Sequence, residues 1–301
     1  MTIRKEWTEE EIQKWARKQR IVREYAPIVE RIKALSGSFN VTQYGALSHN
    51  PARYPLFQVT PRDWDKGKKS ILITAGNHGY EPSGIMATLE FLEKRAPKLT
   101  NEFNIAAYPC ISPWGYEVNH RWDIHAEDPN RGFRRDNPRR DVEECVAFMD
   151  SLDSLGKKFH ASLDLHETPD RDKELRRERA DRFGTKPVDN IDHIPAGFYL
   201  VMDSVYRDKD GSNHPFGQSV INEVAKVTQI APDKEVLNLP NHGGIVDFEA
   251  DGMLATYLRL NGYADFAAIT EVYPDPLPEG EAVAGQLAAI EGALNYIKLS
   301  L

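Results

Sequence analysis

This 301-residue chain has few cysteines, no long apolar run and no excess of positive charge. The two cysteines, Cys110 and Cys145, provide no disulfide framework and no CxxC ligand pair. Lysine and arginine number 38 against 46 aspartates and glutamates, a formal net charge of −8, which argues against a broad nucleic-acid-binding face. No apolar run approaches the roughly 20 residues that a membrane helix needs, so no membrane partner is expected.

The N-terminal stretch also lacks the apolar segment of a signal peptide. Residues 1–20 read MTIRKEWTEEEIQKWARKQR and are charged throughout, which favours a cytoplasmic location. No internal repeat, low-complexity tract or Gly/Ser-rich linker divides the chain, so we expect a single domain over residues 1–301. The sequence leaves the oligomeric state open.

Apolar strands alternate with helices along most of the chain. Residues 1–37 are predicted as an N-terminal helical segment that Pro27 kinks or divides. The later pattern predicts strands at 39–45, 54–60, 70–76, 102–111, 159–166, 197–202 and 266–274, and helices at 82–96, 142–152 and 281–299. This order predicts an α/β fold with a mixed, mostly parallel twisted sheet and helices on both faces.

Residues 167–196 interrupt the pattern with dense charge. Such a run is usually a solvated surface insertion. It also leaves directly from the end of a predicted strand, and long segments of this kind are often functional. A surface insertion and a lid beside an active site are therefore both open.

Polar residues follow two of the apolar strands. His78 and Glu81 come after the strand at 70–76, where α/β proteins place their ligand sites. An ordinary turn would also account for them, because a helix dipole favours a glutamate at a helix start. His166 ends the strand at 159–166, and two histidines with one glutamate form a common catalytic zinc site. The three can share one ion if their strands are neighbours, whereas His160 at the other strand end would lie away from it.

Glu271 stands inside the apolar strand at 266–274. A carboxylate there is costly unless it has a partner or a task. It is either a salt-bridged buried glutamate or a general base acting on a metal-activated water. If the strand alternates, Glu271 shares its face with Ile269.

Residues 112–136 are polar, rich in Gly and Pro, and predicted to be loop. Arginines in such a loop either keep the protein soluble or serve a zinc cleft, by binding a carboxylate or stabilising an oxyanion. The arginines are Arg121, Arg131, Arg134 and Arg135.

The order of these motifs resembles the M14 zinc metallocarboxypeptidases, the carboxypeptidase A family. HxxE, GYExxxRW, DPNRxF, DLH and a strand glutamate follow one another between Phe39 and Tyr273, over most of the chain. The resemblance implies one Zn²⁺ per chain, with His78, Glu81 and His166 as its ligands.

The resemblance also implies roles for five other residues. Asp128 would orient His78, while Asn130 and Arg131 would bind the terminal carboxylate of the substrate. Arg121 would polarise the scissile carbonyl, and Glu271 would act first as general base and then as general acid.

The chain departs from the family at two places. SPWG replaces the usual NPDG and puts Trp114 where a small acidic residue is expected. The lid tyrosine of the animal enzymes has no clear match, because the similar segment 243–250 ends in Glu249 and Ala250. These departures bear on the substrate more than on the metal. We expect a compact, bacterial-type member with no inhibitory prodomain before Phe39.

The sequence is compatible with three functions. The first is a zinc carboxypeptidase acting on a small peptide, which the pairing of DPNR with GYEVNHRW favours. The second is a zinc deacylase of the aspartoacylase and succinylglutamate desuccinylase type, acting on N-acyl amino acids. The third is an inactive zinc-binding module, against which the costly Glu271 argues.

Overall fold

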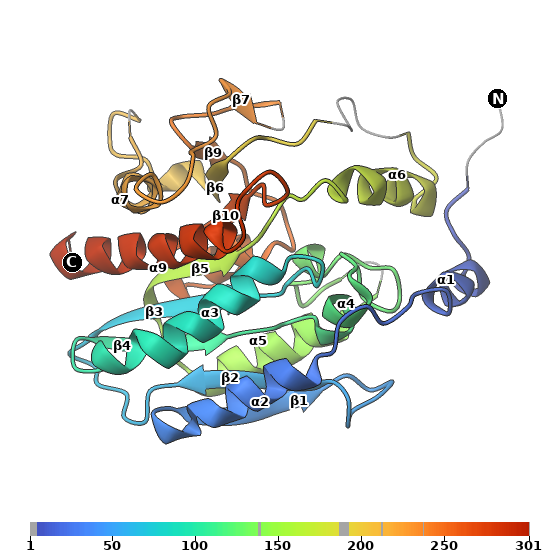
Figure 1. The fold of residues 1–301 in the computed structure, drawn as a ribbon, viewed down its shortest axis with the longest axis horizontal. Coiled ribbons are helices and arrows are strands. Elements are labelled where there is room, and N and C mark those ends of the chain that lie inside the picture. The colour runs from blue at the N-terminus through green and yellow to red at the C-terminus, as the bar shows by residue number, and fades with distance from the viewer. Residues whose placement is uncertain (1–4, 138–139, 187–192, 212, 237, 301) are drawn as a thin grey trace.

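An eight-stranded sheet forms the centre of the computed structural model, which describes residues 5–137, 140–186, 193–211, 213–236 and 238–300 (Figure 1). Its strand order is β1-β2-β4-β3-β5-β10-β6-β9. The strands are β1 (Asn40–Ala46), β2 (Pro55–Thr60), β3 (Lys69–Ala75), β4 (Phe103–Tyr108), β5 (Phe159–Leu165), β6 (Phe198–Met202), β9 (Ile245–Asp247) and β10 (Ala264–Val272), with β7 (Glu235–Val236) and β8 (Leu239–Pro240) as a separate pair.

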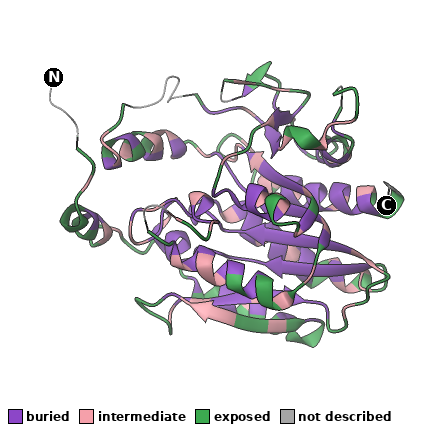
Figure 2. Ribbon diagram, turned by 180° about the vertical axis from the view of Figure 1, so that it is seen from behind, coloured by how far each residue is buried: buried purple, intermediate pink, exposed green. Residues whose placement is uncertain are grey.

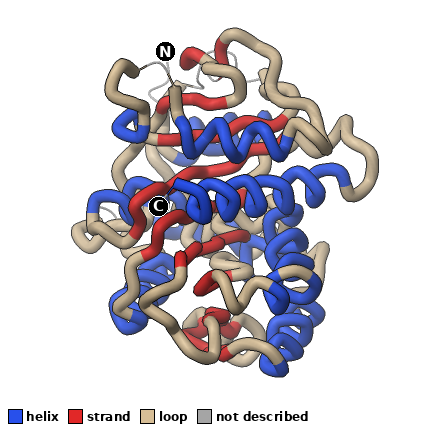
Figure 3. The backbone as a smooth tube through the Cα atoms, turned by 90° about the vertical axis from the view of Figure 1, so that its left-hand side faces the viewer, coloured by secondary structure: helices blue, strands red, loops and turns tan. Residues whose placement is uncertain are grey.

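Parallel pairs join β4, β3, β5 and β10, and also β6 to β9, whereas β1–β2, β2–β4 and β6–β10 are antiparallel. Helices flank the strands on both sides (Figure 3). They are α1 (Glu9–Ala16), α2 (Ala26–Ala34), α3 (Pro82–Lys94), α4 (Pro113–Val118), α5 (Glu143–Leu155), α6 (Asp172–Arg182), α7 (Pro215–Val224), α8 (Leu254–Leu260) and α9 (Glu281–Ser300). The predicted α/β fold with a mixed, mostly parallel sheet is confirmed.

Alternating side chains explain why the central strands form two cores. Along β3, Ile71 and Ile73 point into the core beneath α3 and α9, while Leu72 points into the core with Phe148 of α5. Each such side chain stabilises the fold by roughly 1.5–3 kcal/mol when fully buried. Figure 2 shows the resulting burial along the middle of the sheet. Within the described residues, no helix has the length and apolar character required to cross a bilayer.

The N-terminal prediction needs one correction. The break in the helical pattern lies before Pro27: α1 ends at Ala16, and the next helix begins at Ala26. In between, the backbone N–H of Val22 bonds to the carbonyl of Glu117, and the Val22 side chain is 62% exposed. Pro27 lies in the first turn of α2, where a missing N–H costs no hydrogen bond.

Two other segments are more ordered than predicted. The expected loop at 112–136 contains α4 and a short 3₁₀ helix, Pro129–Arg131. The charged segment 167–196 contains α6, while its residues 187–192 lie outside the described part of the chain. In Figure 1, α6 lies near the end of the sheet where β5 and β10 finish.

Candidate active site

Three potential metal ligands meet where two parallel strands end. His78 follows β3, Glu81 occupies the position just before α3, and His166 follows β5. The two strands are neighbours, with Ala75 opposite Leu165, so the condition for a shared ion is met. The ligand atoms lie within 4.8 Å of one another, and all three residues are buried.

The individual distances show how these atoms face each other. His166 Nδ1 lies 3.1 Å from His78 Nδ1 and 2.8 Å from Glu81 Oε2. Glu81 Oε1 lies 2.9 Å from His78 Nδ1. Both histidines therefore turn Nδ1 towards the same carboxylate.

The other ring nitrogen of each histidine is held by an aspartate. His78 Nε2 lies 3.0 Å from Asp128 Oδ1, and His166 Nε2 lies 2.7 Å from Asp164 Oδ2. Such carboxylates fix ring orientation in metal sites and leave the opposite nitrogen free to bind the ion. The contact of Asp128 was expected by resemblance, whereas the role of Asp164 was missed. Its signal was an aspartate inside an apolar strand, two residues before a candidate ligand.

Electrostatics fit a cation at this point. Burial would raise the pKa of Glu81, but His78 and His166 outweigh it and lower that pKa below its ordinary value. Burial would lower the pKa of His166, but Asp164 and Glu81 together raise it well above its ordinary value. Asp164 and Glu81 thus favour positive charge at the His166 imidazole. Nitrogen and oxygen donors in this combination suit Zn²⁺.

A close backbone contact shapes the turn that carries His78. A Cβ atom on Gly79 would lie 1.9 Å from the carbonyl carbon of Gly115, in α4. Only glycine permits this approach. Gly115 belongs to the SPWG segment, and a Cβ on it would lie 3.0 Å from the His120 carbonyl oxygen and from Ser112 Oγ, so this position is also tightly packed.

Glu271 lies near the end of β10, next to β5. Its Oε2 accepts a hydrogen bond of 2.7 Å from the hydroxyl of Thr168, which also lies 3.2 Å from the Tyr199 hydroxyl. Burial, and then the charge of Glu81, raise the pKa of Glu271 to about 7. A carboxylate with such a pKa is suited to proton transfer near neutral pH. As predicted from strand alternation, Glu271 and Ile269 line the same cavity.

Asn130, Arg131 and Arg121 also reach this cavity. Asn130 Oδ1 accepts a hydrogen bond from the Leu254 backbone N–H at 3.0 Å, which fixes its orientation. Arg121 Nε donates to Asp128 Oδ2 at 3.0 Å. The two remaining arginines of the loop form ion pairs elsewhere. Arg134 pairs with Asp136 and Asp251, and Arg135 pairs with Asp150 and Asp153.

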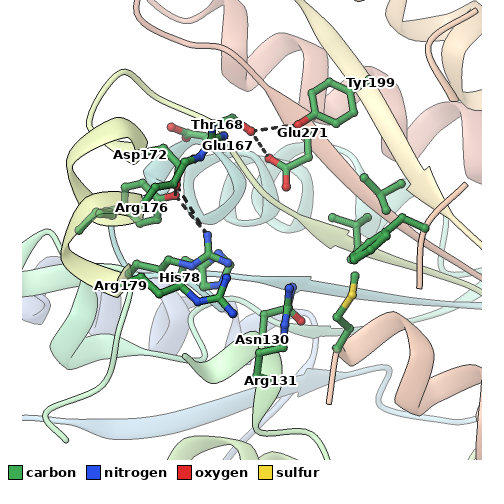
Figure 4. A pocket seen from close by; sticks show the side chains of 17 residues that line it. His78, Asn130, Arg131, Glu167, Thr168, Asp172, Arg176, Arg179, Tyr199 and Glu271 are labelled. Atoms are coloured by element: carbon green, nitrogen blue, oxygen red, sulfur yellow. Dashed lines mark hydrogen bonds and ion pairs between the residues drawn. The ribbon is translucent and has the colours of Figure 1, made fainter. Parts of the chain in front are cut away.

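The cavity has a volume of about 220 Å³ and opens beside α6. Figure 4 shows Glu271 and Tyr199 on one side of it and the side chains of α6 on the other. Four residues of α6 line it at helical spacing: Asp172, Leu175, Arg176 and Arg179. The sequence left a surface insertion and a lid beside an active site both open for this segment and identified none of these four residues. His160, at the far end of β5, bonds to the Ser70 backbone N–H at 3.0 Å.

Comparison with solved structures agrees with the fold predicted from the sequence. No protein-family model and no curated protein matches the sequence. A Shewanella amazonensis structure assigned as a metallopeptidase aligns with a TM-score of 0.69 at 20% identity, covering 91% of both chains.

Two carboxypeptidase structures align at lower identity. The Burkholderia cenocepacia metallo-carboxypeptidase gives a TM-score of 0.60 at 14% identity, covering 90% of this chain and 68% of its own. Carboxypeptidase A of Helicoverpa armigera gives 0.60 at 12% identity, covering 94% and 75%. The chain therefore has the fold of the metallopeptidases and metallo-carboxypeptidases that its motif order predicted.

Proposed function

We propose that this protein is a zinc-dependent hydrolase that removes the C-terminal residue of a peptide. One observation carries the proposal: His78, Glu81 and His166 converge at a single point, and Glu271 and Arg131 face the same cavity. We propose one Zn²⁺ per chain, bound by those three ligands. Zinc supplies a Lewis acid that acidifies a water molecule and polarises a carbonyl oxygen.

The protein groups divide the remaining work. Arg131 and Asn130 bind the free carboxylate of the substrate and so set which bond is cleaved. Glu271 accepts a proton from the attacking water and passes it to the leaving amine. Arg121, held by Asp128, donates to the oxygen that gains charge as the carbonyl is attacked.

We also propose that segment 167–196 restricts which substrates enter the cavity. Its described part supplies α6, and four side chains of that helix line the cavity. Shortening the segment should therefore change KM or substrate range. If shortening lowered the stability of the protein and left its substrate range unchanged, the segment would be structural only.

A substrate panel with purified, zinc-loaded protein tests the proposed function. Blocked dipeptides with a free C-terminus should be cleaved, and a chelator should abolish the activity. Amidated dipeptides should be poor substrates because they lack the carboxylate that Arg131 binds, and Arg131→Ala should raise KM steeply for the free peptides. Equal cleavage of amidated and free peptides contradicts a carboxypeptidase, and cleavage of N-acyl amino acids alone identifies the deacylase alternative.

The inactive-module alternative is tested by the same panel. Zinc bound in stoichiometric amount without hydrolysis of any peptide or N-acyl amino acid would support it. Glu271 argues against an inactive module, because a protein that only binds zinc gains nothing from a costly buried carboxylate at this position.

A further inference from the structure

Arginine is concentrated in the walls of the cavity. The four that line it are Arg121, Arg131, Arg176 and Arg179. Arg121 pairs with Asp128 at 3.0 Å, and Arg176 pairs with Asp172 at 2.5 Å. Among the described residues, neither Arg131 nor Arg179 forms an ion pair. Burial lowers the pKa of Arg131; the charge of Asp128 opposes this shift, and the charges of Arg121 and Arg179 add to it.

The remaining carboxylates of the cavity already have other partners. Glu271 accepts a hydrogen bond from Thr168, and Glu167 accepts one from the backbone N–H of Ser83. Within the described part of the chain, two guanidinium groups in one small cavity are thus left without an ion-pair partner. The proposed function assigns an anion to only one of them, the substrate carboxylate at Arg131.

The helix that carries Arg179 is fixed to the rest of the molecule. Glu178 accepts a hydrogen bond of 2.7 Å from Trp15 Nε1, and its other oxygen lies 3.0 Å from His120 Nε2. Asp172 accepts from the Tyr80 hydroxyl at 3.0 Å. A ligand therefore meets Arg179 on an already positioned element, which reduces the entropy cost of binding.

The cavity has different chemistry at its two ends. Arg131 belongs to the apolar end, since a Cβ on Gly252 would lie 2.2 Å from the Arg131 carbonyl oxygen and Asn130 bonds to the Leu254 N–H. The apolar residues that line the cavity outside α6 are Val201, Phe248, Met253 and Ile269. Arg176 and Arg179 lie across the cavity, on α6 (Figure 4).

We propose that the natural substrate carries an acidic side chain on the acyl side of the scissile bond and that Arg179 binds it. The proposal rests on the carboxypeptidase function. With the terminal carboxylate on Arg131, the leaving residue faces the apolar wall around Met253, and the acyl portion extends towards α6. A carboxylate there forms charge-assisted hydrogen bonds with an otherwise unpaired guanidinium. It also relieves repulsion between Arg131 and Arg179.

Two matched substrates test the proposal: N-benzoyl-glutamyl-leucine and N-benzoyl-glutaminyl-leucine, which differ only in the charge of the acyl-side residue. The zinc-loaded protein should favour the glutamyl peptide in kcat/KM by about tenfold or more. Arg179→Gln should bring this ratio close to one, and Arg179→Lys should restore part of it. Arg177→Gln removes a charge from the same helix at a position outside the cavity lining, so this control should keep the native ratio.

Calorimetry on the Glu271→Gln protein separates this proposal from the function on which it rests. Both peptides stay intact there, and the glutamyl peptide should bind about tenfold more tightly. Tighter binding of the glutamyl peptide without cleavage by the native protein would refute the carboxypeptidase function and leave acid recognition standing. Cleavage of both peptides at equal kcat/KM, or a native ratio in Arg179→Gln, would overturn the role of Arg179.

Discussion

The indole of Trp15 in α1 packs against that of Trp114 in α4, with ring centroids 5.9 Å apart. This contact explains why a large aromatic side chain occupies the SPWG segment, where the carboxypeptidase family has a small acidic residue. The Trp15 indole also donates to Glu178 in α6 at 2.7 Å. One residue of the N-terminal segment thereby joins α4, which abuts the turn of His78, to the helix that lines the cavity.

Replacing Trp15 with alanine should therefore affect both stability and substrate binding. We expect the free energy of unfolding to fall by about 3 kcal/mol, as for other buried tryptophans. KM should rise more than kcat falls, because α6 loses a support while the proposed metal ligands keep theirs. Denaturant unfolding and steady-state kinetics measure the two effects. Trp15→Phe keeps an aromatic ring at this position but loses the Glu178 hydrogen bond and part of the packing, so it should cost less stability than Trp15→Ala. An equal loss of stability in both variants would contradict this account.

Asp164 should determine how tightly the metal is held. Asp164→Asn removes the charge behind His166 Nε2, and zinc affinity should fall about 10- to 100-fold, as for similar partners of metal-bound histidines. His166→Ala should lose the metal altogether while the sheet remains folded. Competition with a chelator and metal analysis after dialysis provide the measurements. A fully metallated His166→Ala protein would refute the ligand assignment.

Glu271→Gln should separate binding from turnover. Glutamine keeps the size of the side chain and can still accept a hydrogen bond from Thr168, but it cannot take up the proton from water. We expect zinc content and substrate affinity close to native and a fall in kcat of roughly 10²–10⁴-fold. Near-native turnover would rule out Glu271 as the general base.

Glu271 should also set the acid side of the pH profile. Its pKa is raised from an ordinary 4.5 to about 7, first by burial and then by Glu81. A general base works only when it is deprotonated, so kcat/KM should fall as the pH drops through this group's pKa. The charge of the proposed zinc ion would lower that pKa, which places the expected fall between pH 4.5 and about 7. A profile flat over this range would contradict the assignment.

Glu144 offers a stability test away from the metal. This residue of α5 is 2% exposed and accepts a hydrogen bond from Ser112 Oγ at 2.9 Å. Burial raises its pKa from 4.5 to about 7, so the folded protein holds this proton more tightly than the unfolded chain does. The native state should therefore lose about 3 kcal/mol of stability from this group as pH rises from 4.5 to 7.

Glu144→Gln should remove most of that pH dependence and be more stable than the native protein at pH 8, but not at pH 4.5. Urea unfolding at the two pH values measures the difference. Asp123, whose pKa burial also raises, remains in the variant and keeps part of the slope. An unchanged slope would show that Glu144 ionises in the folded protein without cost.

The sequence was most informative where local pattern and burial agree. The apolar runs that become β3, β5 and β10 lie at the centre of the sheet, so their composition alone predicted strands there. The polar residues at their ends were then visible as candidates for the site. That His78 lies beside His166 depends on the order of the strands in the sheet, which the local sequence pattern does not reveal.

The contribution of α6 could not be predicted in the same way. Its charged sequence is typical of a solvated surface helix. What fixes it in place is remote in sequence: Trp15 and Glu178 are 163 positions apart. Asp164 was predictable in principle, because an aspartate inside an apolar strand is as costly as Glu271 in β10, which was predicted to belong to the site.

The crossing of Gly79 and Gly115 has a consequence for how mutations in this protein would be interpreted. Any side chain at position 79 would displace either the turn of His78 or the backbone of α4, since its Cβ would lie 1.9 Å from backbone atoms. A mutational scan scored by activity would therefore mark Gly79 as intolerant, although glycine offers no group for chemistry. Sequence change in the turn that carries His78 is therefore limited by the path of α4, and the two segments can change only together.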